Sequence, residues 1–417
     1  MINKIQINLD SFFHSKDKKL EIISISLISI LFFIFFSRLL TGQDMFSHDS
    51  IRWYGVFHLL ADSLSNGIFP YWDPYDFSGQ PFYYNLGILR LYEPVTIGFI
   101  WLSKMFNISM LTAYHWEYMF RIWLTALGVY FCFRQMNKYT LSNLLVFGIF
   151  LFSSFTATSL RQNGILYTFC WAPWALFFLL KVVRNFNFYN MIGLSFFTGI
   201  SLSSYQGVYL LTYLFIFIIT LLINHLQNLK KIFNKKKNIL TIALGLILVV
   251  LFSLPLLTVA IEQNKIVPTA RLDDNASIDK GVSLTYESIA KAGTHSDIAD
   301  FLELIFPAIA RGFFMDKFGG TLNISECFLY IGVFTLIICF FGMRVKSEYR
   351  MNFILTLIIT GLLTLGPKAG IHQILYFLFY PLRVTRHMHL FAGFFIFSFF
   401  YFIGQGTDFI LDKLYKE

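Results

Sequence analysis

Apolar runs of about 20 residues recur along the whole chain and restrict the fold more than any other feature of the sequence. Such a run crosses a hydrocarbon core of ~30 Å as an α-helix. The runs are uninterrupted and do not alternate with polar residues, which favours helices over a β-barrel. We expect about ten spans, at roughly 21–41, 110–133, 140–158, 164–181, 188–203, 207–225, 238–257, 322–343, 351–366 and 388–407. The sequence therefore predicts an all-α polytopic membrane protein with a single transmembrane domain over residues 1–417.

Composition agrees with a chain surrounded by lipid. Of the 417 residues, 56% are hydrophobic and only 14% charged, and the chain contains 51 phenylalanines. A soluble globular protein carries more charge than this. The first apolar run is followed directly by Arg38 and not by small residues that would form a cleavage site. We therefore expect this run to be a retained anchor.

Lysines and arginines in the short loops predict the orientation of the spans. With ten spans, the basic clusters all fall on one side of the membrane, which we assign to the cytoplasm together with both termini. They are Lys4 and Lys16–Lys19, Arg134 and Lys138, Lys181 and Arg184, Lys230–Lys237, Arg344–Arg350, and Lys413 and Lys416. This clustering accounts for most of the net charge of +9. A nucleic-acid partner is therefore not expected.

The opposite side of the membrane receives the three longest connecting segments, so we expect the chemistry there. They are a first outer loop over 42–109, a middle outer loop over 258–321, and a late segment over 367–387. The middle loop is the most polar part of the chain, and its length and polarity suggest a lid over an active site. Cys132, Cys170, Cys327 and Cys339 lie in or next to apolar spans, without the spacing of a zinc site or a disulfide framework.

The first outer loop contains two short helical patterns. Apolar residues recur at helical spacing from Ser50 to about Asn66, which predicts an amphipathic helix in the membrane interface. Gly67 and Pro70 follow as turn formers. The apolar piece over 95–102 is too short to span and is predicted to be a second interfacial or re-entrant helix. Asp49 lies at the start of the first helix, where free backbone N–H groups also suit a phosphate.

A set of motifs carries a family resemblance that extends over nearly the whole chain. The motifs are Gly67–Pro74 with Gly79–Phe82, Glu326 with Tyr330–Val333, Leu365-Gly366, and Pro381–Arg386. In this order the chain resembles the YfhO-type bacterial membrane proteins and, more broadly, the GT-C class of glycosyltransferases. The resemblance implies a GT-C-like fold in the bacterial plasma membrane. It also implies transfer of a sugar from a polyprenyl-phosphate donor to an extracytoplasmic glycan, polymer or lipid acceptor.

Glycosyl transfer to a hydroxyl group needs a base for the acceptor proton and cations for the departing phosphate. Asp49 is our first candidate for the base, although the sequence around it also suits a helix N-cap. Glu93 is the rival base, or a ligand if a divalent metal takes part. We otherwise expect no cofactor.

Several arginines near the predicted outer surface are candidates for binding the donor phosphate, because the guanidinium group offers a fork of donors. The candidates are Arg52, Arg90, Arg161, Arg383 and Arg386, together with His387. Local ion pairing for Arg52, and snorkelling to the interface for Arg383 and Arg386, are the alternatives. Trp72 and Tyr92 are candidates for stacking on a sugar. Arg121 with Glu117 and His115, inside the second span, is interpreted as a structural ion pair.

Other classes of protein share this pattern of hydropathy. A transporter or flippase of lipid-linked oligosaccharides would favour charges near the membrane midplane and an internal repeat; here the charges gather at the outer ends and we find no repeat. A polymerase or ligase of surface polysaccharide would share both the lipid-linked substrate and the outward-facing site. A non-catalytic scaffold is a further alternative.

Overall fold

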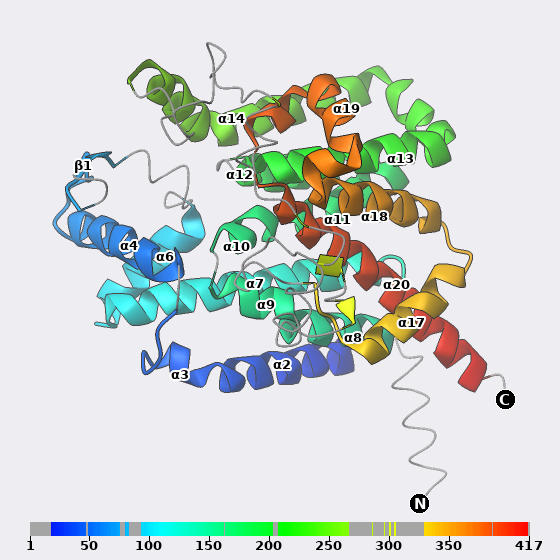
Figure 1. Cartoon of the computed structure of the whole chain (residues 1–417), viewed down its shortest axis with the longest axis horizontal. Coiled ribbons are helices and arrows are strands. Elements are labelled where there is room, and N and C mark those ends of the chain that lie inside the picture. Colours follow the sequence, from blue (N-terminus) through cyan, green and yellow to red (C-terminus); the bar gives the residue numbers. More distant parts are fainter. Residues whose placement is uncertain are drawn as a thin grey trace, which may run out of the picture.

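A computed structural model of the chain describes residues 18–46, 49–75, 80–82, 93–161, 163–202, 207–266, 286, 296, 300–301, 304–305, 329–385 and 387–415. These residues form an all-α structure with one small hairpin, as predicted for the fold class (Figure 1). A helix lies within each predicted apolar run. In chain order the helices are α2 (Lys18–Phe35), α7 (Met110–Arg134), α8 (Thr140–Leu151), α9 (Ser154–Ser159), α10 (Asn163–Phe169), α11 (Ala172–Arg184), α12 (Phe188–Ser201), α13 (Gly207–Phe233), α14 (Lys236–Ile266), α17 (Val333–Arg344), α18 (Arg350–Thr364) and α20 (Phe391–Leu414).

Five helical stretches in the described part of the chain are long and apolar enough to cross a membrane. They are Thr140–Ser159, Gly164–Arg184, Gly207–Leu226, Lys236–Leu254 and Met388–Leu414. The helices α17 and α18 are apolar but shorter. The helix α7 is not among the five, and it carries the charged residues Glu117, Arg121 and Arg134. That the chain crosses the membrane more than five times remains a prediction.

Two of the predicted spans are broken helices, and one predicted loop is shorter than expected. Phe152 and Ser153 separate α8 from α9, and Cys170 and Trp171 separate α10 from α11. The middle outer loop was predicted to begin at residue 258, whereas α14 continues to Ile266. No glycine or proline interrupts the chain between Pro255 and Pro268, so the helix has no local signal to end earlier.

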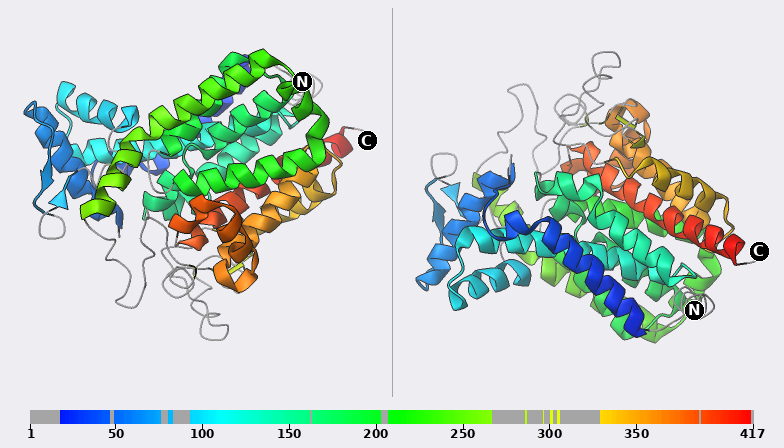
Figure 2. Two further views of the ribbon diagram at one scale, coloured as in Figure 1. Left: turned by 90° about the horizontal axis from the view of Figure 1, so that it is seen from above. Right: turned by 90° about the horizontal axis from the view of Figure 1, so that it is seen from below.

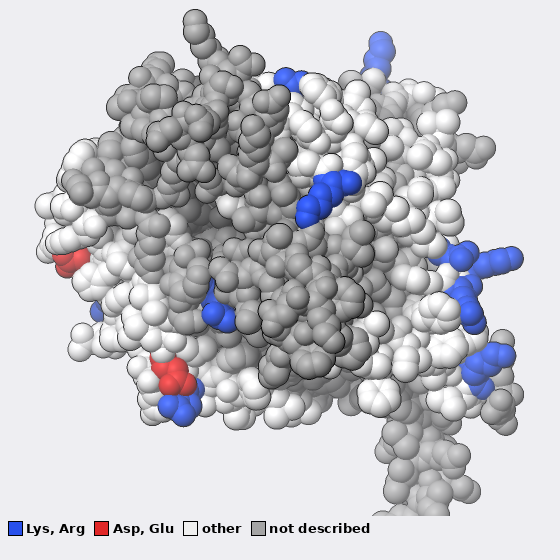
Figure 3. All heavy atoms as spheres, in the orientation of Figure 1, with Lys and Arg blue, Asp and Glu red and all other residues white. Residues whose placement is uncertain are grey.

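One end of the helical body collects basic residues and ion pairs. The helix α2 begins there, α20 ends there, and the α17–α18 connection turns there (Figures 1 and 2). Arg134 pairs with Glu21, and Lys138 pairs with Asp412. Arg184 on α11 pairs with Glu348 at 2.7 Å. Lysine and arginine atoms gather on the surface of this end (Figure 3).

The helix α20 forms the centre of the body, whereas α14 lies at its edge. All of the apolar window of α20 is buried, but only 17% of that of α14 within Lys236–Leu254, so this part of α14 presents most of its side chains to the surroundings. Phe353 on α18 stacks on Tyr401 of α20, with ring centroids 4.1 Å apart. The backbones of α17 and α20 meet at Gly342 and Gly406, where an added Cβ would collide with the opposite main chain.

A smaller unit lies at the end opposite the basic residues (Figures 1 and 2). It comprises α3 (Ser37–Leu40), α4 (Asp49–Ser65), a hairpin of β1 (Trp72–Asp73) and β2 (Gln80–Pro81), and α6 (Pro94–Met105). The strands are antiparallel, with Trp72 opposite Pro81. The helices α4 and α6 confirm the two helices predicted within the first outer loop. Gly67, with a φ of +72°, follows α4 in the left-handed conformation that glycine favours.

The predicted late segment folds into short helices between α18 and α20. They are η3 (Gly366–Ala369), α19 (Ile371–Leu378), η4 (Tyr380–Val384) and η5 (Met388–Leu390). This segment and the unit that contains α4 and α6 lie at well-separated places in the views of Figures 1 and 2. The late segment is therefore apart from the unit that contains α4 and α6.

Candidate active site

The helix that carries Asp49 is fixed to the body through the next residue, Ser50. Ser50 is fully buried. Its carbonyl accepts a hydrogen bond from the Tyr114 hydroxyl at 2.8 Å, and its hydroxyl lies 3.5 Å from that of Tyr118. Its backbone N–H donates to the carbonyl of Arg161 at 3.4 Å. The start of α4 is thereby held between α7 and the turn that joins α9 to α10.

Arg161 is the predicted phosphate ligand that the structure brings next to the start of α4. It lies in the turn after α9, and its side chain is exposed. The ion pairs found among the described residues do not involve Arg161. Exposure leaves its guanidinium group accessible from outside the chain.

Arg161 also lines a cavity of about 800 Å³ between the ends of α2 and α8. The wall is mostly apolar and includes Phe35, Phe36 and Phe152. Ser153 and Thr156 contribute hydroxyl groups. A volume of this size falls in the usual range of small-molecule pockets. The cavity is thus apolar along most of its wall, and Asp44 and Arg161 are its charged lining residues.

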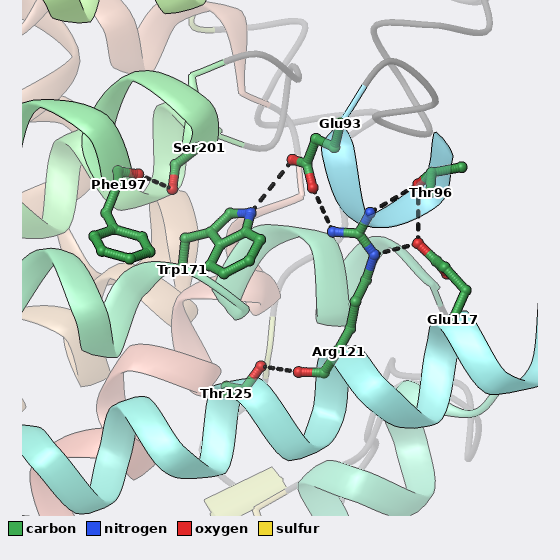
Figure 4. Close-up of polar contacts among 8 residues, drawn as sticks. All are labelled: Glu93, Thr96, Glu117, Arg121, Thr125, Trp171, Phe197 and Ser201. Carbon is green, nitrogen blue, oxygen red and sulfur yellow. Dashed lines mark hydrogen bonds and ion pairs between the residues drawn. The ribbon is translucent and has the colours of Figure 1, made fainter. Parts of the chain in front are cut away.

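Glu93 lies in a separate, fully buried cluster at the start of α6 (Figure 4). Arg121 on α7 forms ion pairs with both Glu93 and Glu117. Its third guanidinium nitrogen donates to the hydroxyl of Thr96 at 2.8 Å, and Thr96 donates to Glu117 at 3.0 Å. The indole of Trp171 donates to Glu93 at 3.3 Å. One guanidinium group thereby joins two carboxylates from different helices.

This geometry favours an anchoring role for Glu93 over the predicted role of base. A general base must reach the proton of its substrate, and a fully buried carboxylate paired with arginine is poorly placed for that task. The expected Arg121–Glu117 pair is present, with Glu93 added to it. His115 instead uses Nδ1 to contact the carbonyl of Leu39 at 2.8 Å.

Aromatic rings connect the buried cluster to the start of α4. The Arg121 guanidinium group lies 5.2 Å from the centroid of the Tyr167 ring. Tyr167 packs edge-on against Tyr118, with centroids 6.0 Å apart, and Tyr118 reaches Ser50. The starts of α4 and α6 are therefore both tied to α7 through one continuous set of contacts.

The hydroxyl of Tyr54 on α4, the helix that begins at the candidate base, stays protonated. Tyr54 lies one turn beyond Ser50 and packs against Tyr114, with ring centroids 5.6 Å apart. Burial raises the pKa of the Tyr54 hydroxyl, because desolvation disfavours the phenolate. Tyr54 is thus a neutral hydrogen-bonding group at neutral pH.

Arg383, predicted to bind phosphate, instead caps a helix. Its Nε donates to the carbonyl of Tyr376 at 3.0 Å and its Nη2 to that of Phe377 at 3.4 Å, near the end of α19. The guanidinium group also lies 5.3 Å from the ring centroids of both Tyr376 and Tyr380. Free carbonyls at a helix C-terminus attract a cation, which accounts for this position. The contacts found for Arg383 are thus with α19 and η4 and not with α4.

Of the remaining predicted site residues, the structure describes the side chains of two and leaves the others outside its described residues. His387 lies beyond η4, where its backbone N–H donates to the Tyr209 hydroxyl at 3.2 Å, and Trp72 lies on the hairpin with 55% of its surface exposed. Arg90, Tyr92, Arg386 and the side chains of Asp49 and Arg52 lie outside the described residues, as does most of the expected lid. Within the described ranges, no group of three His, Cys, Asp or Glu side chains is placed to hold a metal ion.

Comparison with protein-family models gives no match for this chain. Comparison with curated proteins gives none either.

Proposed function

We propose that the chain is a membrane glycosyltransferase of the GT-C type, similar to the YfhO-type proteins. It would move a sugar from a polyprenyl-phosphate donor to an extracytoplasmic acceptor. One observation carries the proposal: the hydrogen bond from Ser50 to the Arg161 carbonyl holds the start of the Asp49 helix beside an exposed arginine at the end of an apolar cavity. An acid, a cation and an apolar wall are what a lipid-linked phosphate donor requires.

In the proposed reaction, Asp49 takes the proton from the acceptor hydroxyl. The acceptor oxygen then forms a bond to the anomeric carbon of the sugar, and the bond from that carbon to the phosphate oxygen breaks. The phosphate leaves with the electron pair of that bond, and the guanidinium group of Arg161 stabilises its charge. Arg52, which follows Asp49 on α4, is a second candidate for this role. Glu93 anchors α6 and takes no part in proton transfer.

The proposed topology has ten spans, with the basic end in the cytoplasm and the α4–α6 unit on the outside. The concentration of lysine and arginine at one end of the body supports this orientation. The opposite end, with Asp49 and Arg161, then faces the extracytoplasmic side. Tagging both termini and testing their accessibility in intact cells would check the orientation.

The decisive experiment replaces Asp49 by Asn, which removes the base and preserves the size of the side chain. We expect lipid-linked sugar to accumulate and glycan modification to stop, as measured by mass spectrometry of lipid extracts and surface polymers. Asp62→Asn, near the other end of α4, is the matched control and should leave modification intact. Unchanged modification in cells that carry only the Asp49→Asn protein would refute the assignment of the base.

A flippase of lipid-linked sugars is the second candidate. The observation that favours it is the buried Glu93–Arg121–Glu117 cluster, because ionisable groups within membrane segments often mark a transport path. A flippase needs no base, so Asp49→Asn would leave its activity intact. The same experiment therefore separates the two functions.

A further inference from the structure

We propose that the cavity between α2 and α8 is a seat for a membrane lipid with a phosphate headgroup, which enters sideways from the bilayer. The inference rests on the proposed function and deepens it, because it names the route and the binding place of the lipid-linked substrate. The headgroup lies at Arg161 and the first part of the chain lies along the apolar wall. The rest of the chain stays in the bilayer.

The charges around the cavity select an anion. Asp44 also lines it, but Arg38 neutralises this carboxylate at 3.0 Å. Ser153 and Thr156 both donate their hydroxyl protons to the carbonyl of Phe150, at 2.9 and 3.1 Å. Arg161 therefore gives the cavity its net positive charge. The fork of donors on its guanidinium group matches the oxygens of a phosphate.

The apolar part of the wall suits a hydrocarbon chain. Phe35 ends α2 and Phe152 follows the last residue of α8, and their ring centroids are 5.8 Å apart. Both rings line the cavity and are also open to the outside, with 71% of Phe35 and 47% of Phe152 exposed. Two exposed phenylalanines on helices surrounded by lipid form an opening toward the acyl chains rather than toward water.

The break between α8 and α9 creates the room for this opening. Helix α8 ends at Leu151, and the next helix starts again at Ser154. The carbonyl of Phe150 accepts the backbone N–H of Ser153 at 3.3 Å and, in addition, the hydroxyls of Ser153 and Thr156. The chain therefore turns aside beside α2 without leaving that carbonyl unsatisfied.

The seat places the headgroup next to the proposed base. Arg161 contributes its side chain to the cavity and its carbonyl to the hydrogen bond with Ser50. A phosphate on the guanidinium group is thus held within reach of the first turn of α4. A lipid that arrives from the bilayer does not have to cross water to reach Asp49.

Binding to the purified full-length protein in detergent tests the proposal, with three probes compared by native mass spectrometry and thermal shift. Geranylgeranyl phosphate should bind and raise the melting temperature. Geranylgeraniol, which lacks the charge, and inorganic phosphate, which lacks the chain, should each bind roughly tenfold more weakly or not at all, because each loses one half of the contacts. Equal binding of the alcohol and the phosphate ester would overturn the proposal, and so would tight binding of inorganic phosphate alone.

Two matched pairs of variants locate the site. Arg161→Gln should weaken geranylgeranyl phosphate binding about tenfold, since a hydrogen bond to a charged group is lost. Arg344→Gln removes an exposed arginine at the basic end and should leave the affinity unchanged. Ala157→Phe narrows the cavity and should weaken binding of the ester, whereas Ile97→Phe enlarges an exposed side chain on α6 and should not. Full affinity in both Arg161→Gln and Ala157→Phe refutes the seat.

The binding assay and the transfer assay can each refute one proposal without refuting the other. Loss of glycosyl transfer in Asp49→Asn, together with full lipid affinity in the two cavity variants, refutes the seat and supports the proposed function. Lipid binding that depends on Arg161 in a protein without transfer activity supports the seat and refutes the function.

Discussion

Replacing Arg121 by Leu is the most informative perturbation of the buried cluster. The substitution removes the single cation that joins Glu93 and Glu117, and it leaves both carboxylates inside the protein. Breaking a buried ion pair by removing one partner costs about 3–5 kcal/mol, because the remaining charge is uncompensated. We therefore expect the free energy of unfolding to fall by about that amount.

A rescue experiment identifies the cause of this loss. If stranded carboxylates are responsible, then adding Glu93→Gln and Glu117→Gln to the Arg121→Leu protein should restore part of the stability, because the buried charges are gone. Arg121→Lys should lose about 1–3 kcal/mol, since one ammonium group cannot reproduce three directed contacts. These values come from unfolding in mild detergent, followed by circular dichroism as SDS is added.

Arg134 provides a control on the same helix. It pairs with Glu21 at the basic end, where 43% of its side chain is exposed. Glu21 is buried but keeps the hydrogen bond from Tyr130, and the guanidinium group of Arg134 is partly hydrated, so Arg134→Leu should cost less than Arg121→Leu. A loss in Arg121→Leu no larger than that in Arg134→Leu would contradict our reasoning. Failure of the neutralised carboxylates to restore any stability would contradict it as well.

Three further substitutions test single features of the structure. Asp408→Asn should cost about 1–2 kcal/mol in the same unfolding assay, because Asp408 accepts from the backbone of Lys138 at 2.6 Å and from that of Tyr139 at 3.2 Å at the start of α8; no change would contradict the capping role. Arg383→Gln should cost about 1 kcal/mol through the lost helix cap, and undiminished stability would argue against that cap. Trp72→Ala should raise the KM for the acceptor without changing the melting temperature, and an unchanged KM would remove Trp72 from the sugar site.

The sequence predicts the helices well because lipid and a packed interior both select apolar residues. Every predicted span contains a helix, and in the part of the chain that the structure describes, lysine and arginine side chains gather at one end of the body. The breaks at Ser153 and at Cys170 were not predicted. Pro173 in the first turn of α11 is a signal for the helix start after Cys170. The break at Ser153 has no such signal and is supported by hydroxyl contacts to the Phe150 carbonyl that hydropathy does not register.

The site was harder to predict, because its key contacts join distant parts of the chain. The Arg121–Glu117 pair follows from the spacing of four residues along one helix. The Arg121–Glu93 pair links residues 28 positions apart on two helices, and no periodicity indicates it. Arg383 was a candidate because it is an arginine near the predicted outer surface. Only the fold shows that it hydrogen-bonds to a carbonyl near the end of α19.

The buried cluster also explains how a site at the membrane surface keeps a fixed geometry. A guanidinium group is planar, and Arg121 uses all three of its nitrogens on different atoms of Glu93, Glu117 and Thr96. A rotation or one-turn shift of α7 would break these contacts together and leave charges in an apolar interior, which is too costly to occur as a thermal fluctuation. The starts of α4 and α6 are thus held in register with α7. The spacing between the start of α4 and Arg161 is therefore determined from within the helical body, and substitutions on α7 should change the proposed transfer activity without contacting the proposed donor.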